Sequence, residues 1–140
     1  MKYSKSDDRT KILIFNQYSL TACDISLISI AEDMEGVVAP SKLYSTLAGG
    51  NVLGVISPET SFLNQLVVKA QCGESFRNGD IQGLANFFLK LYHNKELCEQ
   101  MAYNAREYFC DHFTKDIAID KYANVIDKIC LNSIDYTASK

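Results

Sequence analysis

The chain has 140 residues, of which 47% are apolar and 22% are charged, and its formal net charge is −3 at pH 7. This length predicts one domain that buries roughly two thirds of its unfolded surface, and the apolar fraction excludes a disordered chain. The acidic balance argues against nucleic acid or an acidic membrane as the main partner. No apolar run approaches the roughly 18 residues that a membrane span needs.

The first residues and the cysteines predict a cytoplasmic protein. The N-terminal segment MKYSKSDDRTK is polar and of mixed charge, unlike a signal peptide. No two cysteines form a CxxC pair, so we expect free thiols in a reducing compartment and no metal site. The cysteines are Cys23, Cys72, Cys98, Cys110 and Cys130. The lone histidines His93 and His112 are expected at helix boundaries, without a metal.

Four segments are expected to form strands. Residues 11–16 are a short run of β-forming apolar side chains. Residues 24–30 alternate, with apolar side chains on both faces, which is typical of a strand that is covered on both sides in a parallel sheet. Residues 52–57 form a third strand and residues 72–76 a weaker fourth.

Helices are expected between and after these strands. Residues 41–49 follow Pro40 and end at a Gly-Gly pair, and residues 60–70 follow Pro58. Asp80 is the expected N-cap of a third helix, and two more helices follow it. The expected apolar faces of these last three helices are, in order, Ile81, Leu84, Ala85, Phe88, Leu91 and Tyr92; Leu97, Met101, Ala105 and Tyr108; and Ile117, Ala118, Tyr122, Val125, Ile126 and Ile129.

This alternation of strands and helices predicts an α/β domain. Its core is a parallel sheet with right-handed crossovers, flanked by helices, with two or three helices at the C-terminal end. We place the domain at residues 11–131. The polar segments 1–10 and 132–140 are expected to be frayed.

One loop in this plan has the composition of an anion site. Ligands of open parallel sheets bind at the carboxyl ends of the strands. Between Gly36 and Pro58 the only charged side chain is Lys42, which falls in the first turn of a predicted helix, where the helix dipole disfavours a cation. A phosphate or diphosphate beside Lys42 and Ser41 would explain this position. The alternative is a solvated lysine next to an ordinary serine cap.

An ordered series of motifs adds a family resemblance. The series runs CDISLISI, EGVVAPSKLYSTLAGG, CGESFRNGD and NKELCEQMAYNAREYF. Over about residues 22–131 it resembles the C-terminal domain of GT-B glycosyltransferases, most closely the large retaining family numbered four. The resemblance implies a Rossmann-like domain that binds a nucleoside-diphosphate sugar, a UDP- or GDP-sugar, as substrate. It implies no further cofactor, and it implies a preceding Rossmann-like domain as partner.

The resemblance also assigns residues to the donor. Gly36 and Val37 match the loop that approaches the donor sugar and phosphates. Ser41 and Lys42 match the helix start that faces the diphosphate. Ser45 falls where many relatives bind the ribose hydroxyls with a glutamate, so the expected ribose contact is weakened or replaced.

Two acids remain as candidates near this loop. Glu35 is the acid nearest to Val37, where the family's other motif glutamate would fall, and it is the candidate for a catalytic role. Glu59 follows the third strand and could bind a sugar hydroxyl, or it could be a first-turn helix acid.

The sequence therefore predicts one half of a glycosyltransferase. The chain would hold the donor whose sugar passes to an acceptor hydroxyl, and alone it would transfer no sugar because it lacks the facing domain. The alternative is a glycosyltransferase-like domain that binds or interacts without catalysis. Ser45, Val37 and Val52, which stand where relatives have other residues, favour that alternative. Val52, where relatives usually have Pro, and Asn51, where they often have Arg, leave the identity of the donor open.

Overall fold

The computed structural model describes residues 12–13, 23–31, 34 and 40–138. The predicted segment 1–10 and most of the predicted first strand lie outside this part of the chain. The elements are β1 (Ile12–Leu13), β2 (Ile25–Ser29), α1 (Ser41–Gly49), β3 (Val52–Ile56), α2 (Phe62–Ala70), β4 (Gly73–Phe76), α3 (Ile81–His93), α4 (Lys95–His112) and α5 (Lys115–Ala138).

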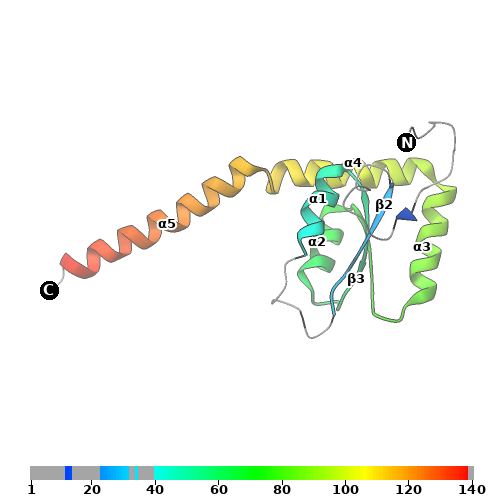
Figure 1. Cartoon of the computed structure of the whole chain (residues 1–140), viewed down its shortest axis with the longest axis horizontal. Helices are drawn as coiled ribbons and strands as arrows, with labels where there is room; N and C mark the ends of the chain where they lie inside the picture. Colours follow the sequence, from blue (N-terminus) through cyan, green and yellow to red (C-terminus); the bar gives the residue numbers. More distant parts are fainter. Residues whose placement is uncertain (1–11, 14–22, 32–33, 35–39, 139–140) are drawn as a thin grey trace.

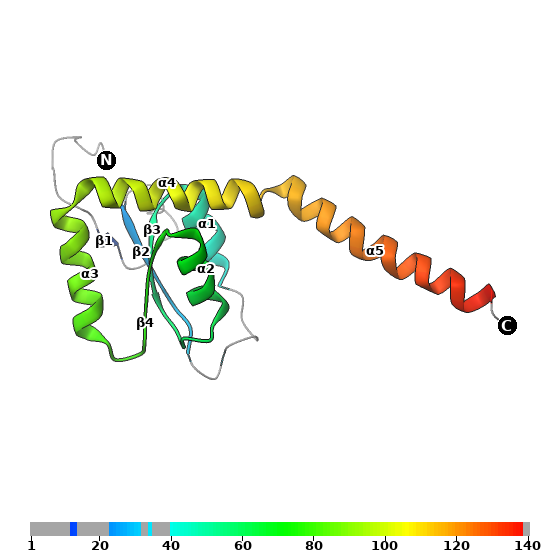
Figure 2. The same ribbon diagram turned by 180° about the vertical axis from the view of Figure 1, so that it is seen from behind.

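The strands form one parallel sheet in the order β1-β2-β3-β4. Helices α1 and α2 cover one face of this sheet, and α3 covers the other (Figures 1 and 2). The predicted α/β fold with a parallel sheet flanked by helices is therefore confirmed, and it is Rossmann-like in architecture. No helix in the described part of the chain is both long enough and apolar enough to cross a membrane.

Each face of the sheet has its own apolar cluster. The cluster under α1 and α2 is made of Ile28, Leu43, Leu47, Leu53, Val55, Leu63, Leu66, Val67, Ala70, Cys72 and Ala105. The cluster under α3 is made of Ile25, Val52, Phe76, Phe87, Leu91 and Cys98. Because strand side chains alternate between faces, β2 and β3 contribute to both clusters, as the apolar residues on both faces of residues 24–30 predicted.

Helix α4 lies across the amino edge of the sheet, which we define as the edge where β2, β3 and β4 begin (Figure 1). Two side chains of α4 also donate hydrogen bonds to carbonyls at the C-terminal ends of α1 and α2. The guanidinium of Arg106 donates to the carbonyl of Ala48 near the end of α1. The amide of Asn104 donates to the carbonyl of Gln71, the C-cap of α2, at 3.0 Å. These bonds satisfy carbonyls that have no partner within their own helix.

The helix boundaries follow the caps. Helix α1 has the predicted bounds and ends at Gly50, whose φ of 67° is the left-handed conformation that glycine adopts at low cost. Asp80 caps α3 as predicted, because its carboxylate accepts from the N–H of Gly83 at 2.9 Å. Helix α2 begins at Phe62 and not at residue 60, because Ser61 is its N-cap and accepts from the N–H of Asn64 at 3.1 Å.

The expected apolar face of α3 was partly wrong. Phe87, which we did not include, is fully buried, whereas Ile81 is 80% exposed and Tyr92 is 51% exposed. The side chains that pack toward the sheet follow the spacing i, i+3, i+4 and i+7, from Leu84 to Leu91. Tyr92 lies about 100° further around the helix than Leu91, so it points away from the sheet.

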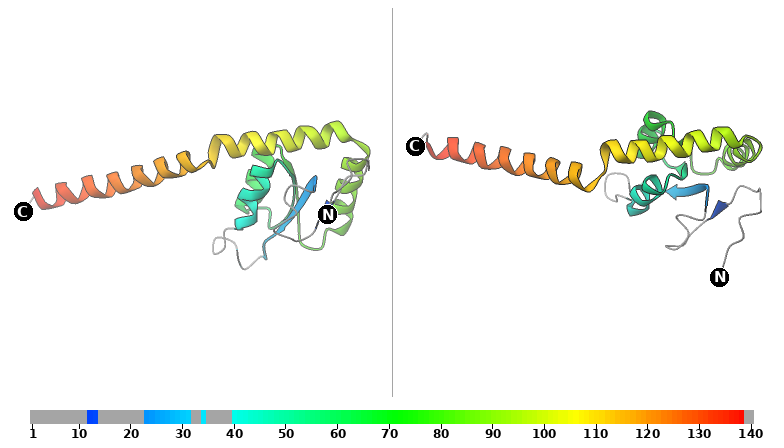
Figure 3. Two further views of the ribbon diagram at one scale, coloured as in Figure 1. Left: turned by 45° about the horizontal axis from the view of Figure 1, so that its top comes forward. Right: turned by 90° about the horizontal axis from the view of Figure 1, so that it is seen from above.

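Helix α5 projects away from the rest of the molecule (Figures 1 and 3). It starts after a break at Phe113, the C-cap of α4, whose φ is −131°. At this break the ring of Phe113 packs edge-on against Tyr44 of α1, with 5.1 Å between centroids. The backbone of α5 is helical through Ala138, which lies within the segment 132–140 that we expected to be frayed.

Candidate anion-binding site

Ser41 and Lys42 form the first two residues of α1, at the carboxyl edge of the sheet. We define the carboxyl edge as the edge where β2, β3 and β4 end, opposite to α4. Both side chains are exposed. The parallel sheet therefore places the two predicted anion ligands at the edge where α/β domains bind their ligands.

The N-terminus of α1 has no side-chain cap among the described residues. Its N-cap position is occupied by Pro40, and the N–H of Leu43 donates to the carbonyl of Pro40 at 2.9 Å. The first turn contains no acidic residue. Ser41 is inside the helix, so the alternative in which it is an ordinary cap is wrong. Among the described residues, neither a side-chain cap nor a first-turn carboxylate lies at this helix start, where the partial positive charge of the helix is concentrated.

Ser45 lies one turn further along α1 and its hydroxyl is used within the helix. Ser45 Oγ donates to the carbonyl of Lys42 at 3.0 Å, a local bond that serine often makes in helices. A glutamate at this position could reach a ribose, whereas the short serine side chain is turned back to its own backbone. The predicted ribose contact through Ser45 stays a prediction.

Glu59 lies at the same edge, in the turn between β3 and α2, and it forms an ion pair. Its carboxylate oxygen Oε1 lies 2.6 Å from Nη2 of Arg77, and Nε of Arg77 also donates to it at 3.1 Å. Both side chains are exposed. Glu59 precedes the N-cap Ser61, so it is not in the first turn of α2, and that alternative is also wrong. Whether Glu59 binds a sugar hydroxyl stays a prediction.

Three of the predicted site residues, Glu35, Gly36 and Val37, lie outside the described residues. Of the remaining four, Ser41, Lys42 and Glu59 lie at the carboxyl edge of the sheet, and Ser45 lies one turn further along α1. Arg77 is a further cation at this edge that the sequence analysis did not single out. Its position directly after β4, in the turn before the Asp80 cap, is a signal that could have identified it.

A cluster of serine hydroxyls joins the ends of β3 and β4. Ser57 Oγ and Ser61 Oγ are 2.7 Å apart, and Ser75 Oγ of β4 lies 3.4 Å from Ser57 Oγ. Ser57 and Ser61 are buried, and each has a hydrogen-bond partner within the protein. The cluster therefore fixes the turn that presents Glu59 and is not itself a free binding group.

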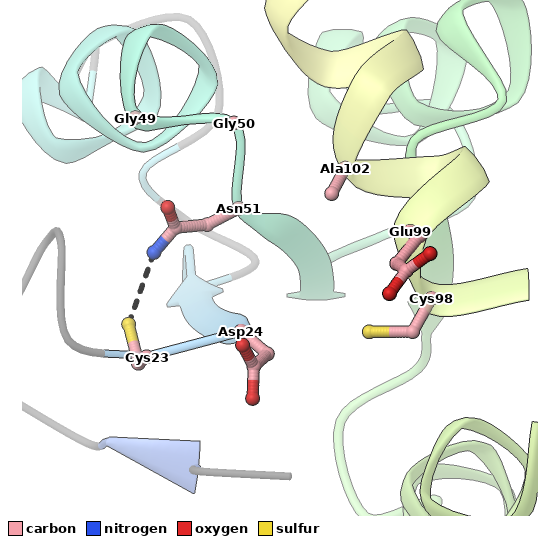
Figure 4. Close-up of a pocket in the computed structure, with 8 residues that line it drawn as sticks. All are labelled: Cys23, Asp24, Gly49, Gly50, Asn51, Cys98, Glu99 and Ala102. Atoms are coloured by element: carbon pink, nitrogen blue, oxygen red, sulfur yellow. Dashed lines mark hydrogen bonds between the residues drawn. The ribbon is translucent and has the colours of Figure 1, made fainter. Parts of the chain in front are cut away.

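A hollow of about 280 Å³ lies at the amino edge of the sheet, whereas Lys42 lies at the carboxyl edge. It is lined by Cys23, Asp24, Gly49, Gly50, Asn51, Cys98, Glu99 and Ala102. Figure 4 shows the amide of Asn51 pointing to Cys23, with Nδ2 donating to Sγ at 3.0 Å. The carboxylates of Asp24 and Glu99 and the C-terminal end of α1 make this hollow electronegative, so it does not suit a phosphate.

Two buried thiols at the amino edge, Cys98 and Cys72, are poor nucleophiles. Burial raises the pKa of Cys98 above its usual value of 9.0, and the charges of Asp24 and Glu99 act in the same direction. Burial also raises the pKa of Cys72 to about 11. A nucleophilic cysteine needs a lowered pKa, so neither thiol supports covalent catalysis.

No group of three or more metal-binding side chains occurs in the part of the chain that the structure describes. His93 and His112 are the last residues of α3 and α4, at the helix boundaries where they were predicted. The ring of His112 packs against Tyr108, with 4.3 Å between centroids, and the ring of His93 lies 5.2 Å from that of Tyr92.

Comparisons of the chain with protein-family models, with curated proteins and with solved structures gave no match. The fold and the position of Lys42 therefore rest on the structure, and the family resemblance remains a prediction from the sequence motifs.

Proposed function

We propose that this chain is the donor-binding domain of a GT-B glycosyltransferase and binds a nucleoside-diphosphate sugar at the carboxyl edge of its sheet. The observation that carries the proposal is the start of α1. In the described part of the chain, a helix N-terminus with no side-chain cap and no acid in its first turn carries the exposed Lys42 at the ligand-binding edge of a parallel sheet. The ordered motifs of the sequence support the same class of ligand.

In this proposal the residues of α1 act on the diphosphate. Transfer breaks the bond between the sugar carbon and the diphosphate oxygen, a bond from the same carbon to the acceptor oxygen forms, and the proton of the acceptor hydroxyl passes to the leaving diphosphate. Negative charge develops on the leaving diphosphate. The ammonium of Lys42, the hydroxyl of Ser41 and the first-turn N–H groups stabilise this charge. A facing domain supplies the acceptor site, so the chain alone binds the donor without transferring sugar.

An NMR titration of the ¹⁵N-labelled chain with UDP, GDP and inorganic diphosphate tests the proposal. We expect the amide signals of Ser41, Lys42 and Leu43 to shift with each nucleotide. Asp24 and Glu99, at the opposite edge, serve as internal controls and should not shift. A response to diphosphate alone shows recognition of the phosphates, whereas a response to only one nucleotide shows selection of the base. No shift with any of the three at millimolar concentration contradicts the proposal.

A second candidate function is a glycosyltransferase-like domain that binds without catalysis. It is favoured by Ser45, whose hydroxyl is bonded to the carbonyl of Lys42, and by Glu59, whose carboxylate is paired with Arg77. Both side chains that could hold sugar or ribose hydroxyls are thus engaged within the protein. Sugar-nucleotide turnover by a protein that includes the sequence encoded upstream excludes this candidate. Nucleotide binding without turnover in that longer protein supports it.

A further inference from the structure

Two residues, Phe113 and Thr114, join α4 to α5, and we call them the elbow. Neither is a glycine, and no glycine follows Gly83 in the sequence. The side chain of threonine is stiff because it is branched at Cβ. A freely turning joint needs backbone groups without fixed partners, so the hydrogen bonds of the elbow decide whether α5 can swing.

The backbone of the elbow belongs to the two helices that it joins. The N–H of Phe113 donates to the carbonyl of Phe109 at 2.8 Å, so it continues the hydrogen bonding of α4. Thr114 begins α5, because its carbonyl accepts from the N–H of Ala118 at 3.0 Å and its Oγ1 accepts from the N–H of Ile117 at 3.5 Å. The two helices therefore follow each other without a slack residue between them.

A side chain of α5 also reaches back to α4. Nζ of Lys121 donates to the carbonyl of His112, the last residue of α4, at 3.3 Å. The last carbonyls of a helix have no partner within it, and the helix dipole makes this end partly negative. The ammonium of Lys121 therefore ties the second turn of α5 to the end of α4 by a charge-assisted bond.

The ring of Phe113 attaches the elbow to the α/β body. It packs against the apolar cluster under α1 and α2, and it meets the ring of Tyr44 of α1 edge-on. The ring of Tyr108 of α4 lies 5.9 Å from it between centroids. Aromatic rings prefer such edge-to-face arrangements, which fix their relative orientation. The elbow is thus held by α1, by α4 and by Lys121 of α5.

The rest of α5 does not contribute to its placement. Ile117 and Ala118 are half-buried, whereas every residue from Ile119 to Cys130 is exposed. Figures 1 and 3 show that α5 extends away from the sheet and from the other helices. The direction of α5 is therefore set at the elbow and not along the helix.

We infer that the elbow is rigid and holds α5 at one angle to the α/β body. Two contacts maintain this angle, namely the ring of Phe113 on Tyr44 and the bond from Lys121 to the carbonyl of His112. The chain then tumbles as one elongated body and not as a domain with a loose helix. The inference concerns the junction of α4 and α5 and does not depend on nucleotide binding.

Residual dipolar couplings of the ¹⁵N-labelled full chain test the rigidity, because they report whether two segments keep one relative orientation. We expect a single alignment tensor to fit the amides of α4 together with those of residues 115–127. A clearly weaker alignment of α5 than of α4 in the unmodified chain overturns the inference.

A matched pair of lysine variants tests the bond across the elbow. Lys121→Met keeps the aliphatic stem of an exposed side chain and removes the donor. We expect the alignment of α5 to fall by about a third relative to that of α4, the difference between rigid and flexible backbone. Lys128→Met is the control, because it makes the same change at an exposed position two turns further along α5, and it should keep the single tensor.

A third variant tests the ring contact. Phe113→Leu keeps an apolar side chain against the cluster under α1 and α2 but removes the edge-on contact with Tyr44. We expect a larger loss of alignment than in Lys121→Met, because this contact joins the elbow to the body. A single tensor in both Phe113→Leu and Lys121→Met overturns the inference that these contacts hold α5.

Discussion

The amino edge and the carboxyl edge of the sheet differ in what closes them. At the amino edge, α4 lies across the strands, and Arg106 and Asn104 bind the ends of α1 and α2. At the carboxyl edge, the described residues are turns with exposed charges, such as Glu59 and Arg77. Among the described residues, a hollow of about 280 Å³ lies at the amino edge, whereas the exposed side chains of Lys42 and Arg77 lie at the carboxyl edge. The difference teaches that α4 gives the amino edge a structural role, whereas the carboxyl edge keeps charged side chains exposed.

The largest expected effect tests how tightly the amino edge is packed. A Cβ on Gly73, at the start of β4, would meet the backbone carbonyl oxygen of Leu53, which cannot move aside without breaking the sheet. Gly73→Ala should therefore lower the free energy of unfolding by about 3 kcal/mol, measured by urea denaturation.

The control for this variant is Gly79→Ala at the carboxyl edge. Gly79 has a φ of 90°, and a Cβ there would meet nothing within 4 Å. Gly79→Ala should therefore introduce only backbone strain, and the expected loss in the free energy of unfolding is about 1 kcal/mol. Equal losses for the two variants would show that the two edges do not differ in packing.

The second prediction uses alkaline pH, because Cys72 is buried at the amino edge. Its pKa of about 11 in the folded protein lies above the value of 9.0 in an exposed thiol, so the folded state holds the proton more tightly. The contribution of the protonated Cys72 thiol to the free energy of unfolding is fully present below about pH 9 and is lost as the pH rises toward about 11. The expected loss in unfolding free energy is at most roughly 3 kcal/mol.

Denaturation curves at several pH values between 8 and about 11 measure this effect. Cys72→Ala should lose less stability over this range than the unmodified chain. Cys110→Ala, at an exposed thiol, is the control and should follow the unmodified chain. A parallel decline of all three proteins would mean that Cys72 does not contribute.

The third and smallest prediction tests the carboxyl edge. Lys42→Ala should weaken nucleotide binding by roughly 1–3 kcal/mol, the range of a charge-assisted hydrogen bond, and should leave the fold intact. Lys69→Ala is the matched control, because Lys69 is an exposed lysine in the last turn of α2, at the amino edge. Calorimetric titration with UDP and GDP measures both. Equal affinities for the two variants would show that Lys42 does not contribute to nucleotide binding.

The sequence predicted the elements well where local chemistry sets their limits. Pro40 and the Gly-Gly pair fixed both ends of α1, and Asp80 fixed the start of α3. The start of α2 was misplaced by two residues because the local signal was missed: Ser61 is the N-cap and accepts from the N–H of Asn64. The further hydroxyl contact of Ser61 with Ser57, which joins the end of β3 to the helix cap, has no signature in the pattern of either element.

In the candidate site, too, the sequence predicts what local chemistry determines and misses contacts between distant residues. Lys42 could be found because a cation in the first turn of a helix contradicts the helix dipole. The ion pair of Glu59 with Arg77 could not be found, since it joins residues 18 positions apart through the neighbouring turns of β3 and β4. The exposure of Ile81 could not be read from periodicity either, because periodicity gives a face but not how far the sheet extends beneath it.

The break at Phe113 between α4 and α5 gives the molecule a long lever arm. Because α5 is about 36 Å long, a rotation of about 10° at this break moves its far end by about 6 Å. The ring contact between Phe113 and Tyr44 of α1 lies at the pivot. A pair of distance labels, one in the α/β body and one near the far end of α5, would therefore detect a change of a few degrees in the angle at this break.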